Sequence, residues 1–325
     1  MISSIAPLQS FSYNYCYHPV PEVFDALSKL PHLKKLRLMF TIFDKDGDYL
    51  PESFSRLQAI EEIDFSDWLN LKELPENIGD MRNLRVINLS NKDRFLLGND
   101  AEIKELPESL GQLANLEELD IFGLQDLKKL PSSFARLKQL KRLDIVGSGI
   151  NELQLTTDQW NNLEDLCMQG PLPDLRQCAN LKKFYYFKNG VSFNYIKGSS
   201  RYGLNGTDEL IKLPLSPLRK LESLKISGGA LDSTDFLTSM INLRVLSLSC
   251  DFDSFPPGFE KLDKLEEIYI FGAKSLSSLP ECLGHLPMLK ELRLTHCGLK
   301  ALPTSVCERK DLLIDIDCCP VKWPE

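Results

Sequence analysis

Cysteine and histidine side chains, which can bind metal ions or act as nucleophiles, gather near the end of the sequence. His296 and Cys297 are followed by Cys318 and Cys319. Two such pairs could hold a zinc ion, which takes four nitrogen or sulfur ligands. Their spacing is irregular for a zinc site, and the alternative is two core cysteines and two surface residues. A nucleophilic Cys318, with His296 and Asp315 as partners, would lack the walls of a pocket. We therefore predict neither a metal site nor a catalytic site here.

No other motif in the sequence predicts catalysis or cofactor binding. Residues 44–48, Asp-Lys-Asp-Gly-Asp, match the start of a calcium loop, but the sixth position is Tyr49 and the twelfth is Ser55. The loop needs glycine and glutamate there, so an acidic turn is the better interpretation. The sequence has neither a glycine-rich phosphate loop nor two histidines at zinc-protease spacing. We predict a protein that is not an enzyme and that takes no cofactor.

Composition and cysteine content restrict the predicted cellular compartment and the kinds of partner that the chain is expected to bind. The chain has 325 residues, of which 43% are hydrophobic and 26% charged, an ordinary balance for a soluble protein. Its 9 cysteines are odd in number and irregularly spaced, which favours free thiols in a reducing compartment and hence a cytoplasmic location. No apolar run is long enough to predict a membrane span. A net charge of −8 argues against binding to nucleic-acid phosphates.

A repeated pattern of apolar residues organises almost the whole chain. Repeats that begin at Ile60, Leu116 and Leu265 are each followed by the next repeat after 24 residues. A fixed period of this length predicts a solenoid, in which each repeat stacks on its neighbours. In the repeat that begins at Leu116, the apolar positions are Leu116, Leu119, Ile121, Leu124, Leu127, Leu130, Phe134 and Leu137.

The spacing of the apolar residues changes along each repeat. The alternate residues Leu119 and Ile121 predict a short strand with one buried face. Around Pro131 the apolar residues recur every three or four positions, which predicts a short helix or 3₁₀ turn with the proline in its first turn. Because one repeat cannot bury both of its apolar edges, the array should fold as a single object.

This pattern resembles the leucine-rich repeat, L-x-x-L-x-L-x-x-N/C-x-L followed by L-P-x-x-L-x-x-L, over almost the whole chain. The resemblance implies an α/β fold, a right-handed solenoid or horseshoe with a concave parallel β-sheet and short helices or 3₁₀ turns on the convex side. It implies little about function, because very different proteins use this repeat as a binding platform. We predict a single leucine-rich-repeat domain over residues 1–325.

We predict about thirteen repeats, interrupted by insertions near 92–105 and 187–215. The second insertion is rich in glycine, serine, asparagine and aromatic residues, and either contacts a ligand or packs as a loop on its own aromatics. Charges support the register, because the residues after each repeat's first position alternate in sign between repeats, as in Lys34-Lys35 and Glu61-Glu62. The repeats begin at Leu8, Leu33, Ile60, Leu84, Leu116, Leu140, Leu163, Leu181, Leu221, Leu243, Leu265, Leu289 and Asp311.

The asparagine position of the repeat is mostly occupied by other residues, among them Trp68, Leu124, Ser148 and Ala273. Backbone groups in these turns then need other hydrogen-bond partners. This variation, with Leu-Pro-x-x-Leu retained, resembles the leucine-rich regions of plant intracellular immune receptors and of bacterial repeat proteins, including secreted effectors. The residues do not decide between these two groups.

The concave face of the sheet is the predicted binding site. An acidic run in the first half of the chain and the basic Lys225 and Arg293 in the second half should face solvent there. Several aromatic rings on this face have no evident role in folding, and such rings often dominate binding energy. The alternative is that each ring packs over a lateral neighbour and shields the sheet. The predicted partner-binding residues are Phe40, Asp64, Asp120, Phe122, Asp144, Tyr185, Phe187, Lys225, Tyr269, Phe271 and Arg293.

The predicted function is recognition of a partner protein or peptide, with no nucleic-acid partner, no membrane contact and no prediction of oligomeric state. The alternative is a ligand-sensing segment of a larger multidomain immune receptor or bacterial effector whose active domain is absent from this sequence. A purely structural spacer is a third class.

Overall fold

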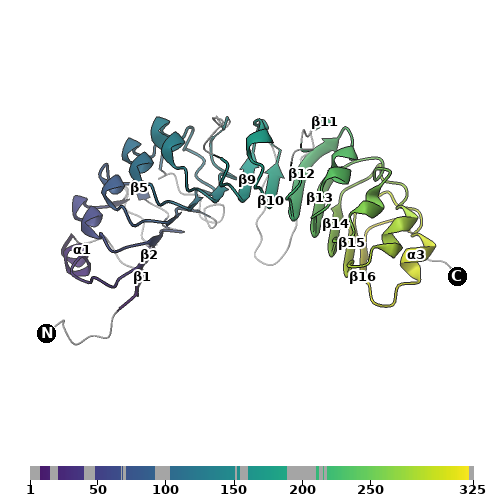
Figure 1. Cartoon of the computed structure of the whole chain (residues 1–325), viewed down its shortest axis with the longest axis horizontal. Helices are drawn as coiled ribbons and strands as arrows, with labels where there is room; N and C mark the ends of the chain where they lie inside the picture. Colours follow the sequence, from purple (N-terminus) through teal and green to yellow (C-terminus); the bar gives the residue numbers. More distant parts are fainter. Residues whose placement is uncertain are drawn as a thin grey trace. The chain divides into compact units, whose positions relative to one another are not determined.

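The computed structural model describes residues 8–14, 21–39, 48–66, 68, 71–91, 103–150, 152–153, 160–188, 210–211, 215 and 218–321. The chain divides into two compact units, residues 1–163 (the first unit) and 164–325 (the second unit). In each unit, parallel strands line one face and short helices lie on the other (Figure 1). This confirms the leucine-rich-repeat fold, whereas a single domain over residues 1–325 stays a prediction.

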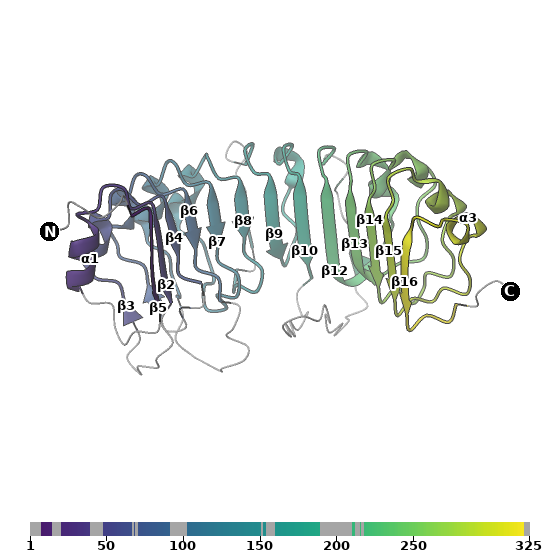
Figure 2. The ribbon, with the colours of Figure 1, turned by 90° about the horizontal axis from the view of Figure 1, so that it is seen from below.

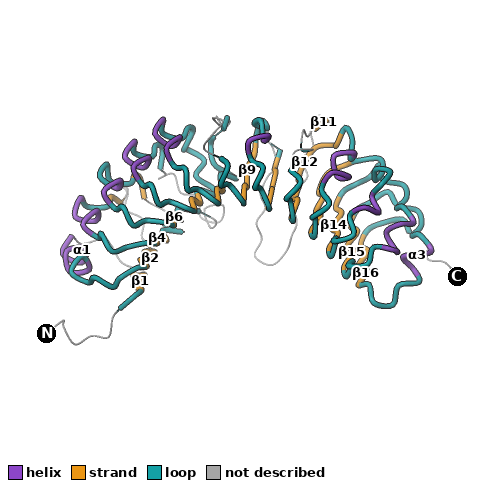
Figure 3. Tube along the Cα trace, viewed as in Figure 1, coloured by secondary structure: helices purple, strands orange, loops and turns teal. Residues whose placement is uncertain are grey.

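In the first unit, successive repeats each add one short strand to a parallel sheet. A separate parallel pair joins β3 (Asp48–Tyr49) to β5 (Leu71–Glu73). The sheet runs in the order β1 (Ser10–Asn14), β2 (Lys35–Met39), β4 (Glu62–Asp64), β6 (Val86–Asn88), β7 (Glu118–Asp120) and β8 (Arg142–Asp144). The helices are α1 (Pro21–Leu27) and the 3₁₀ helices η1 (Glu52–Arg56), η2 (Ile78–Asp80), η3 (Glu108–Gln112) and η4 (Ser132–Arg136) (Figure 3).

The second unit repeats this arrangement with longer strands, which lie side by side in Figure 2. The short β11 (Leu210–Ile211) pairs with the end of β12. The sheet runs in the order β9 (Asp165–Gln169), β10 (Lys183–Phe187), β12 (Ser223–Leu231), β13 (Val245–Asp251), β14 (Glu267–Phe271), β15 (Glu291–Thr295) and β16 (Leu313–Asp317). The helices are η5 (Leu175–Gln177), η6 (Asp235–Ser239), η7 (Phe259–Lys261), η8 (Glu281–His285) and α3 (Thr304–Cys307).

The strand register agrees with the predicted repeat starts in both units. In the first unit Leu119 lies beside Ile87 on one side and Leu143 on the other, and all three side chains are fully buried. In the second unit β10 pairs with both β9 and β12. The strands on either side of the 187–215 insertion are therefore neighbours. Most of this insertion, and most of that near 92–105, lies outside the described residues.

The leucine-proline motif starts a 3₁₀ helix, as the spacing predicts. Pro131 directly precedes η4 as its N-cap, and its carbonyl accepts a hydrogen bond from the Phe134 N–H at 3.0 Å. The proline is thus one residue outside the first turn, where the expectation had placed it inside. Phe134 and the neighbouring Leu137 are buried in the hydrophobic core.

Where the consensus asparagine is absent, the turn is stabilised either by a buried apolar side chain or by another hydrogen bond. Trp68 and Leu124 are buried at this position and extend the core. Ser148 replaces the asparagine with a hydroxyl that donates to the Ile145 carbonyl at 2.7 Å and accepts from the Ile150 N–H at 3.3 Å. The polar ladder of the consensus is thus partly exchanged for apolar packing, which stabilises the turn by burial instead.

Candidate functional site

Ion pairs between adjacent strands form a ladder at the amino-terminal ends of the strands in each unit. Glu117 accepts from Arg85 at 2.7 Å and from Lys141 at 2.8 Å, so one carboxylate joins three successive strands. Glu266 in the second unit likewise lies 2.5 Å from Arg244 and 2.8 Å from Lys290. The predicted alternation of charge therefore corresponds to real lateral pairs, which favour the observed register over a shifted one.

The pairing of Glu266 predicts a pH dependence of stability. Hydrogen bonds from Arg244 and then Lys290 lower the pKa of Glu266 from 4.5 to about 2. Because the folded state favours the ionised carboxylate, this stabilisation is present above pH 4.5 and is lost as the pH falls towards 2. The melting temperature of the parent should therefore fall more steeply over this window than that of Glu266→Gln. Scanning calorimetry at several pH values measures this difference.

Glu260, an exposed carboxylate on η7, provides the control for this titration. Glu260→Gln should keep the steep pH dependence of the parent. If Glu266→Gln and Glu260→Gln lose stability with the same slope, the ion pairs of Glu266 do not stabilise the fold.

The acidic row of the first unit lies on the solvent-facing side of the sheet, where the sequence predicts it. Asp64, Asn88, Asp120 and Asp144 are lateral neighbours, one on each of four adjacent strands. Each side chain accepts a hydrogen bond from the backbone N–H two residues later, at 3.0 to 3.1 Å. Asp64 also forms an ion pair with Arg37 at 3.4 Å. These residues thus end their strands with a turn, a structural role that the sequence analysis did not assign.

Tyr185 and Lys225 lie side by side on β10 and β12 of the second unit. The Lys225 ammonium lies 4.7 Å from the centre of the Tyr185 ring, within the range of a cation–π interaction. The Tyr185 hydroxyl oxygen lies 3.5 Å from that of Ser223. Both Tyr185 and Lys225 are partly exposed, so the structure presents a ring and a charge to solvent at a fixed separation.

Tyr269 lies between two like charges. Glu267 and Glu291 are lateral neighbours, and the Tyr269 hydroxyl oxygen lies 2.8 Å and 3.1 Å from their carboxylates. Arg293 covers the Tyr269 ring at 5.6 Å and pairs with Glu291. Burial and these hydrogen bonds raise the pKa of Tyr269. Tyr269 therefore has a structural role that its position in the repeat did not predict, because its single hydroxyl proton can be donated to either of these two carboxylates.

The remaining predicted aromatics lie near the ends of their strands. Phe271 ends β14, and its ring meets the imidazole of His296 edge-on at a centroid distance of 5.5 Å. Phe187 ends β10, and Phe122 follows β7; both are partly exposed. Phe40 lies outside the described residues.

The structure therefore brings the predicted residues together in two groups, one in each unit. The first group is the acidic row. In the second group, Ser247 separates Lys225 from Tyr269 along one lateral row, which continues to Arg293 and Asp315. We call the solvent-facing side of the strands in each unit its sheet face. The first group presents charge on its sheet face, and the second group presents both charge and aromatic surface.

The described cysteines and histidines do not gather into a metal-binding cluster. Within the described ranges, no group of three or more histidine, cysteine, aspartate or glutamate side chains is placed to hold a metal ion. The backbone N–H of Cys297 donates to the Cys319 sulfur at 3.3 Å. Burial raises the pKa of the Cys297 and Cys178 thiols to about 12, so both are protonated and unreactive at neutral pH. Among the described helices, none has the length and apolar character needed to cross a bilayer.

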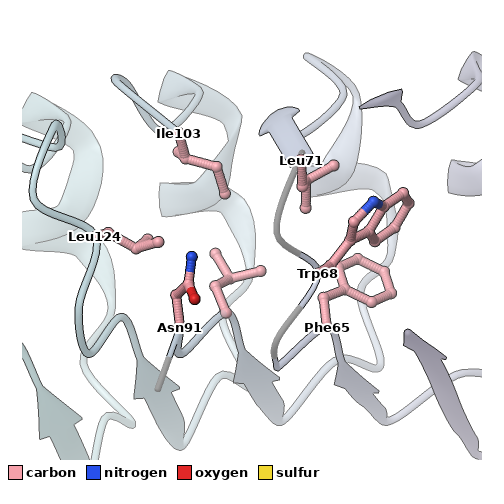
Figure 4. Close-up of a pocket in the computed structure, with 7 residues that line it drawn as sticks. Phe65, Trp68, Leu71, Asn91, Ile103 and Leu124 are labelled. Atoms are coloured by element: carbon pink, nitrogen blue, oxygen red, sulfur yellow. The ribbon is translucent and has the colours of Figure 1, made fainter. Parts of the chain in front are cut away.

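A small internal cavity lies in the first unit, behind the sheet (Figure 4). Its volume of about 10 Å³ suffices for no more than one water molecule. The Asn91 side-chain oxygen is buried there without a hydrogen bond to any described group. The lining residues are Phe65, Trp68, Leu71, Leu89, Asn91, Ile103 and Leu124.

The parallel strands, their register and the short helices make this chain a leucine-rich-repeat protein in fold. A leucine-rich-repeat protein of Leptospira interrogans matches it with a TM-score of 0.63 at 18% identity, over 96% of this chain and 81% of that one. The functional domain of InlJ from Listeria monocytogenes matches with a TM-score of 0.61 at 15% identity, over 98% of this chain and 64% of that one. At these identities the likeness shows the fold alone.

One further solved structure and one curated protein also resemble this chain. The structure of PEPR1 with AtPEP1 matches with a TM-score of 0.56 at 17% identity, over 96% of this chain and 46% of that one. A protein of Arabidopsis thaliana, named as a candidate disease resistance protein, is 26% identical over 152 residues, which are 46% of this chain. The matched segment spans 12% of that protein's length. No protein-family model matches the chain.

Proposed function

We propose that this chain is a recognition platform that binds a partner protein or peptide on its sheet faces. The supporting observation is the pair of cation–aromatic contacts, Tyr185 with Lys225 and Tyr269 with Arg293. Rings held by their neighbours on a sheet lose little conformational freedom when a partner binds. Tyrosine and arginine are also the side chains that most often dominate the energy of protein interfaces.

The two units offer surfaces of different chemistry to a partner. In the first unit Phe40, Asp64, Asp120, Phe122 and Asp144 would meet a basic or mixed segment, because the acidic row carries three carboxylates on one partly exposed face. In the second unit the partner would contact Tyr185, Phe187, Lys225, Tyr269, Phe271 and Arg293. Each unit would therefore select a partner segment of complementary charge.

The likeness to the PEPR1–AtPEP1 structure supports a peptide or protein ligand for this chain. The alternative is a ligand-sensing segment of a larger immune receptor or effector, and the match to a short part of an Arabidopsis thaliana protein favours it. Under both proposals the chain acts in cytoplasmic signalling without catalysis. The net charge of −8 supports a partner that is not a nucleic acid.

The test first isolates a partner from the native source with the immobilised chain and then measures its affinity by calorimetry. Tyr185→Ala removes the ring beside Lys225 and should weaken binding by about 2 kcal/mol or more, which is roughly thirtyfold. Tyr269→Phe keeps the ring and removes the hydroxyl between the two carboxylates, so it should lower stability while most of the affinity remains.

Met288 is 47% exposed, lies before β15 and is not on the sheet face, so Met288→Ala is the matched control and should bind as the parent does. Equal affinity of the parent, Tyr185→Ala and Tyr269→Ala would show that the partner does not use the sheet face.

A further inference from the structure

A shallow basic hollow lies at the amino-terminal ends of the strands in the second unit. Its volume is about 370 Å³, and it is formed where the chain enters β10, β12, β13 and β14. The residues that line this basic hollow are Lys182, Lys220, Glu222, Asn242, Arg244 and Lys264. Four cations and one carboxylate thus surround the hollow, in a chain whose net charge is −8.

The residues directly before the strands form a row with equal numbers of positive and negative charges. Lys182 pairs with Glu164 at 2.8 Å, and Arg244 pairs with Glu266 at 2.5 Å. Glu222 lies between them in the strand order and favours the charged forms of both Lys182 and Arg244. With Lys290, which pairs with Glu266, this row contains three cations and three carboxylates. Its charges therefore cancel locally, and the row serves the register.

The residues directly before the repeat starts form a second row, in which the positive charges are not balanced by negative ones. Lys220 donates to the side-chain oxygen of Asn180 at 2.6 Å, and Lys264 donates to that of Asn242 at 2.6 Å. An amide oxygen positions an ammonium group but carries no charge to neutralise it. Both lysines are exposed, so the asparagines hold two positive charges at the rim of the basic hollow. These two charges give the hollow its attraction for anions.

The spacing of the two lysines indicates the shape of the anionic ligand. Lys220 precedes β12 and Lys264 precedes β14, and these strands are separated by β13. Strands in a sheet are about 4.8 Å apart, so the two attachment points are about 10 Å apart. A peptide in the polyproline II conformation advances about 3.1 Å per residue with three residues per turn, so residues i and i+3 face the same side about 9 Å apart.

We propose that the basic hollow binds an extended acidic peptide segment whose carboxylates are three residues apart, one at Lys220 and the next at Lys264. Two separated anionic groups match the divided charge better than one compact anion does. This site lies at the strand ends and is separate from the sheet face, so the inference goes beyond the recognition proposed above and can fail without it.

The test measures binding of fluorescein-labelled peptides to the full chain by fluorescence anisotropy at low ionic strength. The probe is a twelve-residue peptide, about four turns of polyproline II, with glutamate at every third position. A second peptide carries glutamine at these positions, and a third carries the same glutamates in one block. The probe should bind more tightly than both, and its affinity should fall as salt is added.

Substitutions at the rim give the decisive comparison. The double variant Lys220→Gln/Lys264→Gln should weaken binding of the probe by about tenfold. Lys274 and Lys300 are exposed lysines of the second unit outside the basic hollow, and Lys274→Gln/Lys300→Gln should bind as the parent does. Tyr185→Ala should leave this affinity unchanged, which separates the hollow from the sheet face.

Three results would overturn the proposal. Equal losses in the two double variants would mean that the peptide responds to overall charge. Equal binding of the glutamate and glutamine peptides would remove the electrostatic basis. Displacement of the probe by tripolyphosphate at a lower concentration than by unlabelled peptide would identify a site for compact anions instead of a peptide site.

Discussion

Leu119→Ala should lower the free energy of unfolding by about 2–5 kcal/mol. Leu119 is fully buried in β7, between Ile87 and Leu143 of the adjacent strands. Truncation removes apolar contacts and leaves a cavity whose walls belong to three repeats. Because the hydrogen-bonded strands on both sides keep these walls apart, the cavity can close only in part.

Urea unfolding of the full chain, followed by circular dichroism, measures this loss. Leu313→Ala provides the matched control, because Leu313 is 58% exposed on β16 and its truncation should cost no more than about 0.5 kcal/mol. If the two variants unfold at the same urea concentration, Leu119 does not belong to the core and the strand register is wrong.

The strand register could be predicted from the sequence because two independent patterns indicate it. The period of 24 residues places Leu116, Leu119 and Ile121 in the core. The alternating charges beside the strands then determine which strands are neighbours, even across the 187–215 insertion, where the period is lost. Both patterns reflect contacts between successive repeats, and such contacts recur at every repeat.

The hydrogen bonds of individual side chains were not predictable from spacing. Asp120 occupies a solvent-facing position whether its carboxylate binds a partner or accepts from the Phe122 N–H, as it does here. Tyr269 likewise occupies one position for either role, and only the distances to Glu267 and Glu291 reveal its place in folding. Periodicity assigns a face to a residue, whereas the turn geometry and the lateral neighbours decide what the residue does there.

The basic hollow has a signal in the sequence. The residue directly before each repeat start alternates between lysine and asparagine over Asn180, Lys220, Asn242 and Lys264. This alternation becomes visible only when the repeats are aligned by their first positions. A ladder of opposite charges stabilises register, whereas lysines alternating with neutral amides leave net positive charge, on which the proposed peptide site depends.

Gly111→Ala should destabilise the fold by about 1–3 kcal/mol, although it adds a single methyl group. Gly111 lies in η3, and a Cβ there would stand 2.3 Å from the Ser133 carbonyl oxygen in η4. Gly79 has the same relation to the Ser109 carbonyl oxygen, also at 2.3 Å. Gly111 is not among the residues with a positive φ, so space and not backbone conformation requires glycine. The helix η3 packs closely on η2 and on η4 because Gly79 and Gly111 lack a side chain.

Ala135 occupies the position in η4 that Gly111 occupies in η3, and it provides the matched control. Ala135→Gly should cost about 0.5–1 kcal/mol, through backbone entropy alone. Adding Ser133→Gly to Gly111→Ala removes the side-chain atoms that lie 2.5 and 2.7 Å from the new Cβ but leaves the closer carbonyl oxygen. The double variant should therefore recover little of the lost stability in urea unfolding. Full recovery would place the conflict at the Ser133 side chain, and the spacing of the helices would then be set by that side chain and not by the approach of two backbones.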